Sequence, residues 1–140
     1  MSVPPEHRDA VRFSFGDSPE LADELLDLVL AGKKTATCGT LSQFGEGGEP
    51  MPQVGRRDVV LDGQGRPAAV IETTEVTVKR FDEVDEAFAR DEGEGDGTLV
   101  YWRDAHETYF ARNGGFAHDM QLVCERFRVV DVLNRQDLKE

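Results

Sequence analysis

The stretch AGKKTATCGTL, at residues 31–41, places Lys33 and Lys34 beside Thr35 and Thr37. Nucleophilic catalysis by an alcohol requires a neighbouring group that accepts its proton, and Lys34 and Thr37 supply such a pair. A structural role is the alternative. Lysines such as Lys33 interact favourably with the negative end of a helix, by ~0.3–1 kcal/mol, and threonines such as Thr35 are common in strands. Residue types alone leave both interpretations open.

The turn before this stretch determines whether Lys34 and Thr37 can meet. In a regular strand, residues three apart point to opposite faces of the sheet. Lys34 and Thr37 therefore converge only if Lys34 still belongs to the turn after Gly32. Glycine suits the left-handed conformation that often follows a helix end, so Gly32 makes this geometry available.

Other polar groups could join the pair. The acidic segment at 92–97, EGEGDG, reads as a solvated turn, but its glycines would also let Glu92 or Glu94 fold into a pocket. Cys38 could attack a carbonyl. However, no histidine lies near it in sequence, and buried cysteines mostly behave as small hydrophobic residues.

The spacing of the histidines and of the glycines excludes a metal site and a phosphate-binding loop. His7, His106 and His118 lack the spacing of metal ligands, so we predict no metal site and no cofactor. No glycine motif that cradles phosphate is present, because the glycines at 92–97 alternate with carboxylates that would repel a phosphate. Trp102 is expected in the core or in a pocket wall rather than as a base-stacking platform.

Length, composition and net charge reduce the classes of function that this protein can have. The 140 residues fit one domain, and the two cysteines, with no signal-peptide pattern, favour a reduced, cytoplasmic protein. No apolar run approaches the ~20 residues of a membrane helix. Sixteen basic against twenty-eight acidic residues give a formal charge of −12, which repels nucleic-acid backbones unless the basic residues gather on one face. A small, weakly charged ligand meets no such barrier.

Alternating and helical apolar patterns predict the elements that position these groups. Asp17 or Ser18 can cap a helix that Pro19 opens, and DGQG at 62–65 is typical of a hairpin turn. The predicted order is strand 11–15, helix 19–31, strand 35–41, loop 44–53, hairpin strands 59–61 and 68–78 with a bend, helix 81–90, a helix capped by Thr98 and ended at Asn113, strand 122–133 and a polar tail at 134–140. This order favours an α+β fold in which helices flank a small curled, mostly antiparallel sheet or barrel.

Two segments, FGDSPELADELLDLVLAGKKTATCGTL and FDEVDEAFARDEGEGDGTLVYWRDAH, closely resemble the ASCH domain in its longer bacterial form. The resemblance covers roughly residues 11–133 and implies one domain over 1–140 with polar termini. It also implies a PUA-like fold, a small β-barrel with flanking helices. The family was proposed to bind RNA by analogy with PUA domains, an analogy of fold that does not establish function.

One branch of that family, the amidohydrolases that deacetylate acetylated cytidine, resembles this chain in a signature Gly-x-Lys-Thr-x-Thr. The resemblance matches the catalytic lysine to Lys34, the second threonine to Thr37 and the catalytic glutamate to Glu92. Those enzymes continue the signature with arginine and acidic residues, whereas this chain continues with CGTL at 38–41 and carries an extra helix with Trp102. We expect Lys33, Thr35 and Trp102 to contact the substrate.

The resulting hypothesis is hydrolysis of an amide on a nucleobase or nucleoside such as an N-acylated cytidine. Thr37 would attack the acyl carbonyl, and either Glu92 or Lys34 would take its proton, a choice that the sequence leaves open. The alternative is a non-catalytic RNA- or nucleotide-binding module, or a ribonuclease, that uses the same cleft. Its basic rim would consist of Lys33, Lys34, Arg56, Arg57, Lys79 and Arg80.

Overall fold

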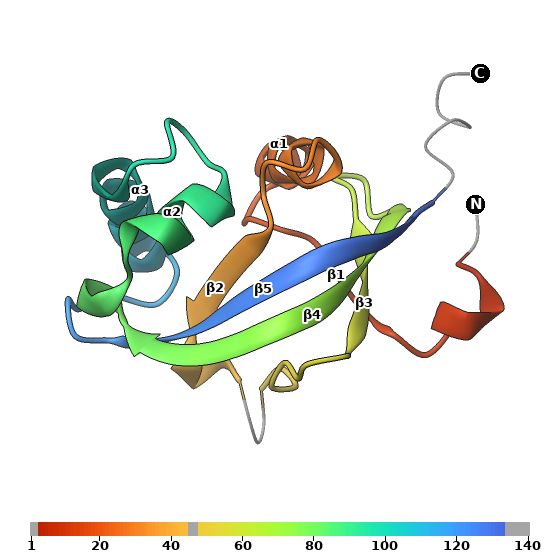
Figure 1. The fold of residues 1–140 in the computed structure, drawn as a ribbon, viewed down its shortest axis with the longest axis horizontal. Coiled ribbons are helices and arrows are strands. Elements are labelled where there is room, and N and C mark those ends of the chain that lie inside the picture. The colour runs from red at the N-terminus through yellow and green to blue at the C-terminus, as the bar shows by residue number, and fades with distance from the viewer. Residues whose placement is uncertain (1–2, 45–47, 134–140) are drawn as a thin grey trace.

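The computed structural model describes residues 3–44 and 48–133. The predicted polar tail at 134–140 lies outside these residues, as do positions 1–2 and, in the predicted loop, 45–47. The strands of the described part are β1 (Val11–Phe13), β2 (Ala36–Thr40), β3 (Arg57–Leu61), β4 (Pro67–Arg80) and β5 (Gln121–Val132). They form one sheet in the order β1-β3-β4-β5-β2 (Figure 1).

The long strands β4 and β5 account for the curl of the sheet. They pair antiparallel, with register shifts between Val70 and Ile71 and between Thr73 and Glu75. Such bulges bend a strand and increase its twist, so the predicted bend in this arm is present. The pair β1–β3 is parallel, and the other three pairs are antiparallel. The α+β fold with a curled, mostly antiparallel sheet is confirmed, as a half-barrel whose unpaired edges in the described chain are β1 and β2.

Three α-helices in the described residues begin at side-chain caps. They are α1 (Pro19–Leu30), α2 (Glu86–Glu92) and α3 (Leu99–Arg112), capped by Ser18, Asp85 and Thr98. Each cap accepts a hydrogen bond from the backbone N–H three residues later, which satisfies a donor with no partner inside the helix. The prediction of a helix at 81–90 is wrong at its start, because the helix begins only after the cap at Asp85. α2 starts after it, and Phe81–Glu83 form a separate short 3₁₀ turn.

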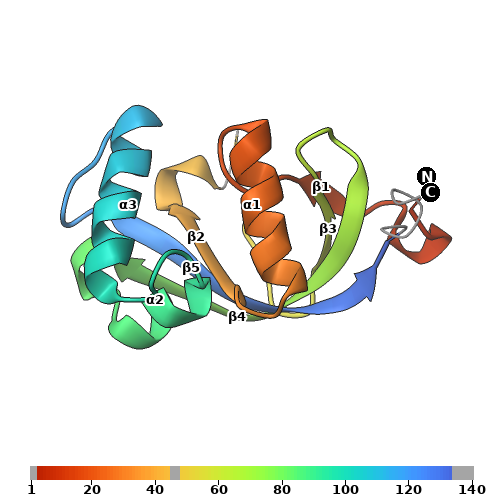
Figure 2. The same ribbon diagram turned by 90° about the horizontal axis from the view of Figure 1, so that it is seen from above.

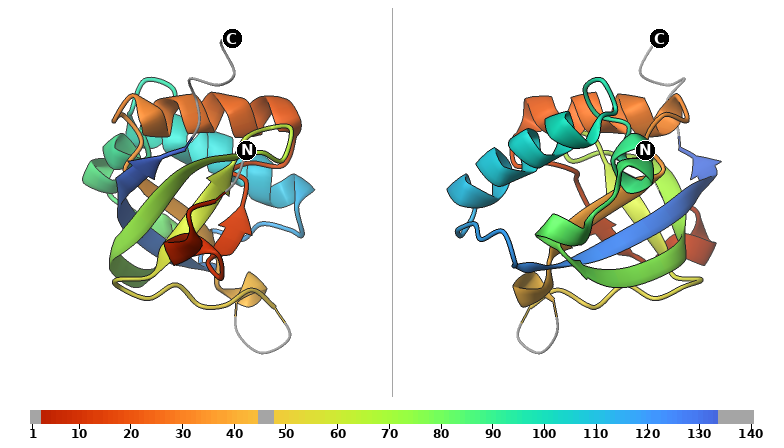
Figure 3. Two further views of the ribbon diagram at one scale, coloured as in Figure 1. Left: turned by 90° about the vertical axis from the view of Figure 1, so that its right-hand side faces the viewer. Right: turned by 60° about the vertical axis from the view of Figure 1, so that its left-hand side comes forward.

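The helices lie on one side of the sheet. In Figure 2, α1 crosses its middle while α2 and α3 stand over the end where β2 lies, and Figure 3 shows α1 across the top from two further directions. Two of the three groups of buried apolar side chains join these helices to the sheet. One joins α1 to the sheet through Leu25, Leu26, Val29, Val60, Ile71 and Phe127. The other joins α2 and α3 to it through Phe81, Phe88, Trp102, Phe110, Leu122 and Cys124.

Two predicted strands are shorter than expected. β1 ends at Phe13 rather than at residue 15, and Phe15 is buried in the core beneath α1. β2 begins at Ala36 rather than at Thr35. The Thr35 N–H donates to the carbonyl of Asp91, and only its carbonyl bonds to β5, by accepting from the Phe127 N–H. Within residues 3–44 and 48–133, no helix combines the length and apolar character that crossing a bilayer demands.

Candidate active site

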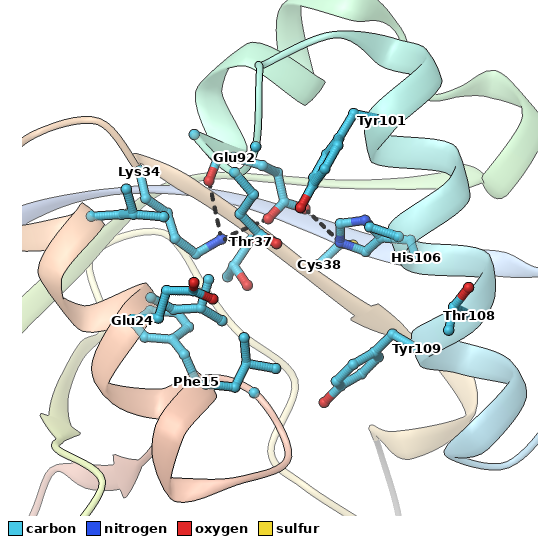
Figure 4. Close-up of a pocket in the computed structure, with 18 of the residues that line it drawn as sticks. Phe15, Glu24, Lys34, Thr37, Cys38, Glu92, Tyr101, His106, Thr108 and Tyr109 are labelled. Atoms are coloured by element: carbon cyan, nitrogen blue, oxygen red, sulfur yellow. Dashed lines mark hydrogen bonds and ion pairs between the residues drawn. The ribbon is translucent and has the colours of Figure 1, made fainter.

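The junction between α1 and β2 brings Lys34 and Thr37 to one cavity. Gly32 adopts a left-handed backbone with φ +80°, and the N–H groups of Lys33 and Lys34 both donate to the carbonyl of Leu28, at 3.0 and 3.1 Å. Lys34 therefore lies in the turn before β2, which is the condition for its convergence with Thr37. Both residues line a cavity of about 720 Å³ between α1 and α3 (Figure 4).

The ammonium group of Lys34 is buried and bonded on several sides. Its Nζ donates to Glu92 Oε1 at 2.7 Å, to Glu94 Oε2 at 3.0 Å and to the backbone carbonyl of Ala36 at 2.9 Å. The Lys34 and Glu92 side chains are each 1% exposed. Burial favours the neutral amine, but the charges of Glu92 and then Glu94 outweigh it and raise the pKa of Lys34. Lys34 is therefore a fixed cation at neutral pH.

Glu92 ends α2, and three side chains face its carboxylate. Besides Lys34, the indole Nε1–H of Trp102 donates to Oε2 at 3.2 Å, and His106 Nε2 lies 3.6 Å from Oε2. Burial disfavours ionisation, but the charge of Lys34, followed by that of His106 and the hydrogen bonds from Lys34 and Trp102, lowers the pKa of Glu92. The site therefore holds an ionised carboxylate against a permanent cation.

Gly93 allows α2 to approach the Lys34 turn. It caps α2 in a left-handed conformation with φ +72°, and a Cβ at this position would overlap the carbonyl of Lys33. Two residues earlier, the carbonyl of Asp91 accepts the Thr35 N–H at 2.7 Å. The end of α2 is thus joined to the junction by backbone contact, and this contact places Glu92 beside Lys34.

The three residues expected to contact substrate occupy different environments. Lys33 is exposed and lines the cavity. Thr35 does not line it; it borders a smaller hollow of about 280 Å³ beside Phe127. Trp102 is 2% exposed and also lies outside the lining. It sits behind the site, where it holds Glu92 and stacks on His106 with ring centroids 4.2 Å apart.

Sequence reasoning missed the cluster formed by Cys38, Glu92 and His106. One donor atom from each lies within 4.8 Å of the others, and Figure 4 shows His106 directed towards Glu92 from α3. The three residues are distant in sequence, so spacing could not reveal them. The available signal was the i, i+4 spacing of Trp102 and His106, which places both on one face of a helix.

The cluster is poorly suited to a metal ion or a reactive thiolate. A divalent cation would compete for Glu92 with the Lys34 ammonium, which is already in contact at 2.7 Å. Burial, followed by the charge of Glu92, raises the pKa of the Cys38 thiol well above its ordinary value. Thiolate is the form that ligates metals and attacks carbonyls.

Aromatic and acidic side chains form much of the remaining wall of the cavity. Phe15 contributes one aromatic ring and the tyrosines of α3 two more, with carboxylates from α1, α3 and the loop between α2 and α3. These residues are Phe15, Tyr101, Tyr109, Glu24, Glu94 and Asp104. An aromatic cavity with a few polar groups is typical of a small-molecule site.

The basic rim expected for RNA binding is not assembled at this cavity. Of its six members only Lys33 and Lys34 line the cavity, and Lys34 is neutralised by two carboxylates. Three of the others pair with acidic partners, Arg56 with Asp58, Arg57 with Glu72 and Arg80 with Asp82. These pairs reduce the positive charge available to phosphates.

Comparison with known proteins identifies similar chains. Residues 11–131 match the family model described as ASCH domain. The crystal structure of an ASCH domain from Lactobacillus crispatus JV V101 is 36% identical, covers 92% of this chain and 87% of its own, and superimposes with a TM-score of 0.81. A protein from Enterococcus faecalis V583 is also 36% identical, covers 100% of this chain and 83% of its own, and has a TM-score of 0.82.

A more distant structure shares the fold alone. ASCH from Zymomonas mobilis is 12% identical, covers 93% of this chain and 75% of its own, and has a TM-score of 0.54. No curated protein sequence matches the chain.

Proposed function

This chain belongs to the ASCH domain family, and from that premise we propose that it hydrolyses the amide bond of an N-acylated nucleobase or nucleoside, such as an N-acylated cytidine. The observation that carries the proposal is the buried contact of Lys34 Nζ with Glu92 Oε1 at 2.7 Å, in the cavity that Thr37 also lines. An alcohol, a carboxylate and an ammonium group are the parts that acyl transfer requires.

The charge states of the site support one division of the catalytic roles. Lys34 stays protonated because Glu92 and Glu94 raise its pKa despite burial, so it serves as the cation that stabilises the oxyanion. Thr37 Oγ1 attacks the acyl carbon while Glu92, which its neighbours keep ionised, accepts the hydroxyl proton. The C–N bond then breaks and leaves an acyl ester on Thr37, which water hydrolyses.

The lining of the cavity supports an uncharged ligand. The rings of Phe15, Tyr101 and Tyr109 offer faces for a planar base. The carboxylates of Glu24 and Asp104 lie at the same cavity and would repel a phosphate. We therefore expect an unphosphorylated nucleoside or free base rather than a nucleotide.

The direct experiment compares two substitutions of Thr37 in a hydrolysis assay with N4-acetylcytidine. Thr37→Val keeps the shape of the side chain but removes the hydroxyl, and it should lower kcat/KM at least ~10³-fold. Thr37→Ser retains a hydroxyl and should stay within about tenfold of the wild type. Equal rates for the wild type and Thr37→Val would refute the proposed nucleophile.

A further inference from the structure

His106 is held rigidly at the edge of the cavity. Its ring stacks on Trp102 at an interplanar angle of 20°, and its Nδ1 lies 2.9 Å from the Trp102 carbonyl. Because a carbonyl only accepts hydrogen bonds, Nδ1 carries the hydrogen of this contact. The remaining nitrogen, Nε2, therefore faces Glu92 Oε2 at 3.6 Å, with the side chain 12% exposed at the cavity.

Cleavage of an amide needs a proton for the departing nitrogen, and the other lining groups are poor sources. The ammonium of Lys34 is engaged by two carboxylates that raise its pKa. Burial raises the pKa of the Cys38 thiol and of the Tyr109 phenol. An imidazole is the side chain that ordinarily gains and loses a proton near neutral pH, and His106 is the histidine that lines the described cavity.

We propose that His106 is the acid–base residue of the leaving group: its Nε2–H protonates the nitrogen that departs from the acyl carbon. The inference rests on the proposed amidohydrolase function. As the C–N bond breaks, its electron pair takes the proton from the imidazolium, and the free amine leaves. Neutral Nε2 then removes a proton from the water that attacks the Thr37 ester. Glu92 returns its proton to Thr37 Oγ1 as the carboxylic acid departs.

The groups around His106 favour this cycle. Glu92 presents its Oε2 to Nε2 from α2, at 3.6 Å. Cys38 faces it from β2 as a neutral thiol, since burial raises its pKa. On α3 itself, Trp102 supplies the stacked ring and the carbonyl acceptor, and Lys34 lies beyond the carboxylate of Glu92.

The test compares two acetyl donors that differ in their need for a proton. N4-acetylcytidine releases an amine that must be protonated, whereas 4-nitrophenyl acetate releases a stable phenolate. His106→Asn retains an amide that can bond the Trp102 carbonyl. It should lower the rate of acylation by acetylcytidine by ~10²–10⁴-fold, with little effect on the initial burst of 4-nitrophenolate that reports acylation by the ester. The control is His118→Asn, because His118 is exposed and packs on Phe81 and Phe116 away from the cavity.

The outcomes separate this inference from the function on which it rests. Equal losses in the acylation rate of both donors, or no loss with acetylcytidine, would overturn the role of His106 in protonating the leaving group, while Thr37→Val still tests the function. If the wild type hydrolyses neither donor, both ideas fail together. An independent measurement is histidine NMR with cytidine, the expected product. Cytidine should shift the ring signals of His106 and leave those of His118 in place, and unchanged His106 signals would argue against contact.

Discussion

Lys34 and Glu92 form an ion pair that is buried at both ends, with Nζ and Oε1 2.7 Å apart and each side chain 1% exposed. Residue 34 follows α1 and residue 92 ends α2, so the pair fastens two elements that are far apart in sequence. Removing one partner of such a pair leaves an uncompensated buried charge, which is costly. The pair is therefore expected to matter for stability as well as for chemistry.

Lys34→Met should reduce the free energy of unfolding by ~3–5 kcal/mol, because Glu92 would lose its cation. Urea denaturation at neutral pH measures this change. The matched control is Arg80→Met, which breaks a pair whose side chains are 51% and 39% exposed and should leave the free energy of unfolding nearly unchanged. A similar cost at the two positions would contradict the burial of the Lys34–Glu92 pair.

Stability should fall in acid through Glu92. The folded protein lowers the pKa of this carboxyl below its ordinary 4.5, so the unfolded chain binds more protons in that window and stability rises with pH. The contribution is fully present above pH 4.5 and is lost as pH falls through the folded pKa.

Urea unfolding of the wild type and of Glu92→Gln across this range isolates the effect. The stability advantage of the wild type should shrink below pH 4.5, because glutamine does not titrate. The hydrogen bond from Arg112 helps lower the pKa of Asp17 to about 2. Asp17 is present in both proteins, so its effect on stability cancels in the comparison. A difference that stayed constant well below pH 4.5 would mean that the neighbours of Glu92 do not lower its pKa.

Gly93→Ala should destabilise the fold more than a comparable glycine substitution elsewhere. Gly93 and Gly55 both have positive φ, +72° and +91°, but an added Cβ would meet the Lys33 carbonyl at Gly93 and nothing within 4 Å at Gly55. Gly55→Ala should cost only the left-handed backbone, ~1–2 kcal/mol. Gly93→Ala should cost a further ~1–3 kcal/mol of unfolding free energy from overpacking. Urea denaturation measures both variants. Equal costs for Gly93→Ala and Gly55→Ala would exclude the close approach of Gly93 to the Lys33 carbonyl.

Both cysteines should react slowly with iodoacetamide in the folded protein. Burial is the main reason that the pKa of Cys38 lies well above its ordinary value and that the pKa of Cys124 is raised to about 12. Alkylation requires the thiolate, which is the reactive form of cysteine. At about pH 8, alkylation followed by mass spectrometry should be at least ~10-fold slower in the native protein than in urea. Rapid modification of Cys38 in the native state would instead indicate an activated thiol.

Ligand binding should depend little on salt if the cavity receives a nucleoside. Binding Z phosphates of a single strand gives a log–log slope of about −0.7Z, whereas an uncharged nucleoside releases no counterions. Calorimetry with cytidine and fluorescence anisotropy with a single-stranded RNA oligonucleotide, both at several salt concentrations, compare the two. Tight, strongly salt-dependent binding of the oligonucleotide would favour the RNA-binding alternative.

Several features of the fold could be predicted from the sequence because they depend on nearby residues. Ser18 and Pro19 define the start of α1 through a local cap, and the turn at 62–65 joins β3 to β4 as an antiparallel pair. The helix predicted at 81–90 was wrong in its start, because the hydrogen bond from Phe88 N–H to Asp85 caps α2 at a later residue.

By itself, the sequence determined the secondary-structure order, the turn at Gly32 and three chemical groups to consider together, Lys34, Thr37 and Glu92. The position of Trp102 behind Glu92, the absence of Thr35 from the cavity lining and the presence of His106 and Cys38 beside Glu92 follow from the tertiary structure. Caps, turns and apolar periodicity act over a few residues. The neighbours of Glu92 depend instead on how α2 and α3 pack against β2, which long-range contacts alone establish.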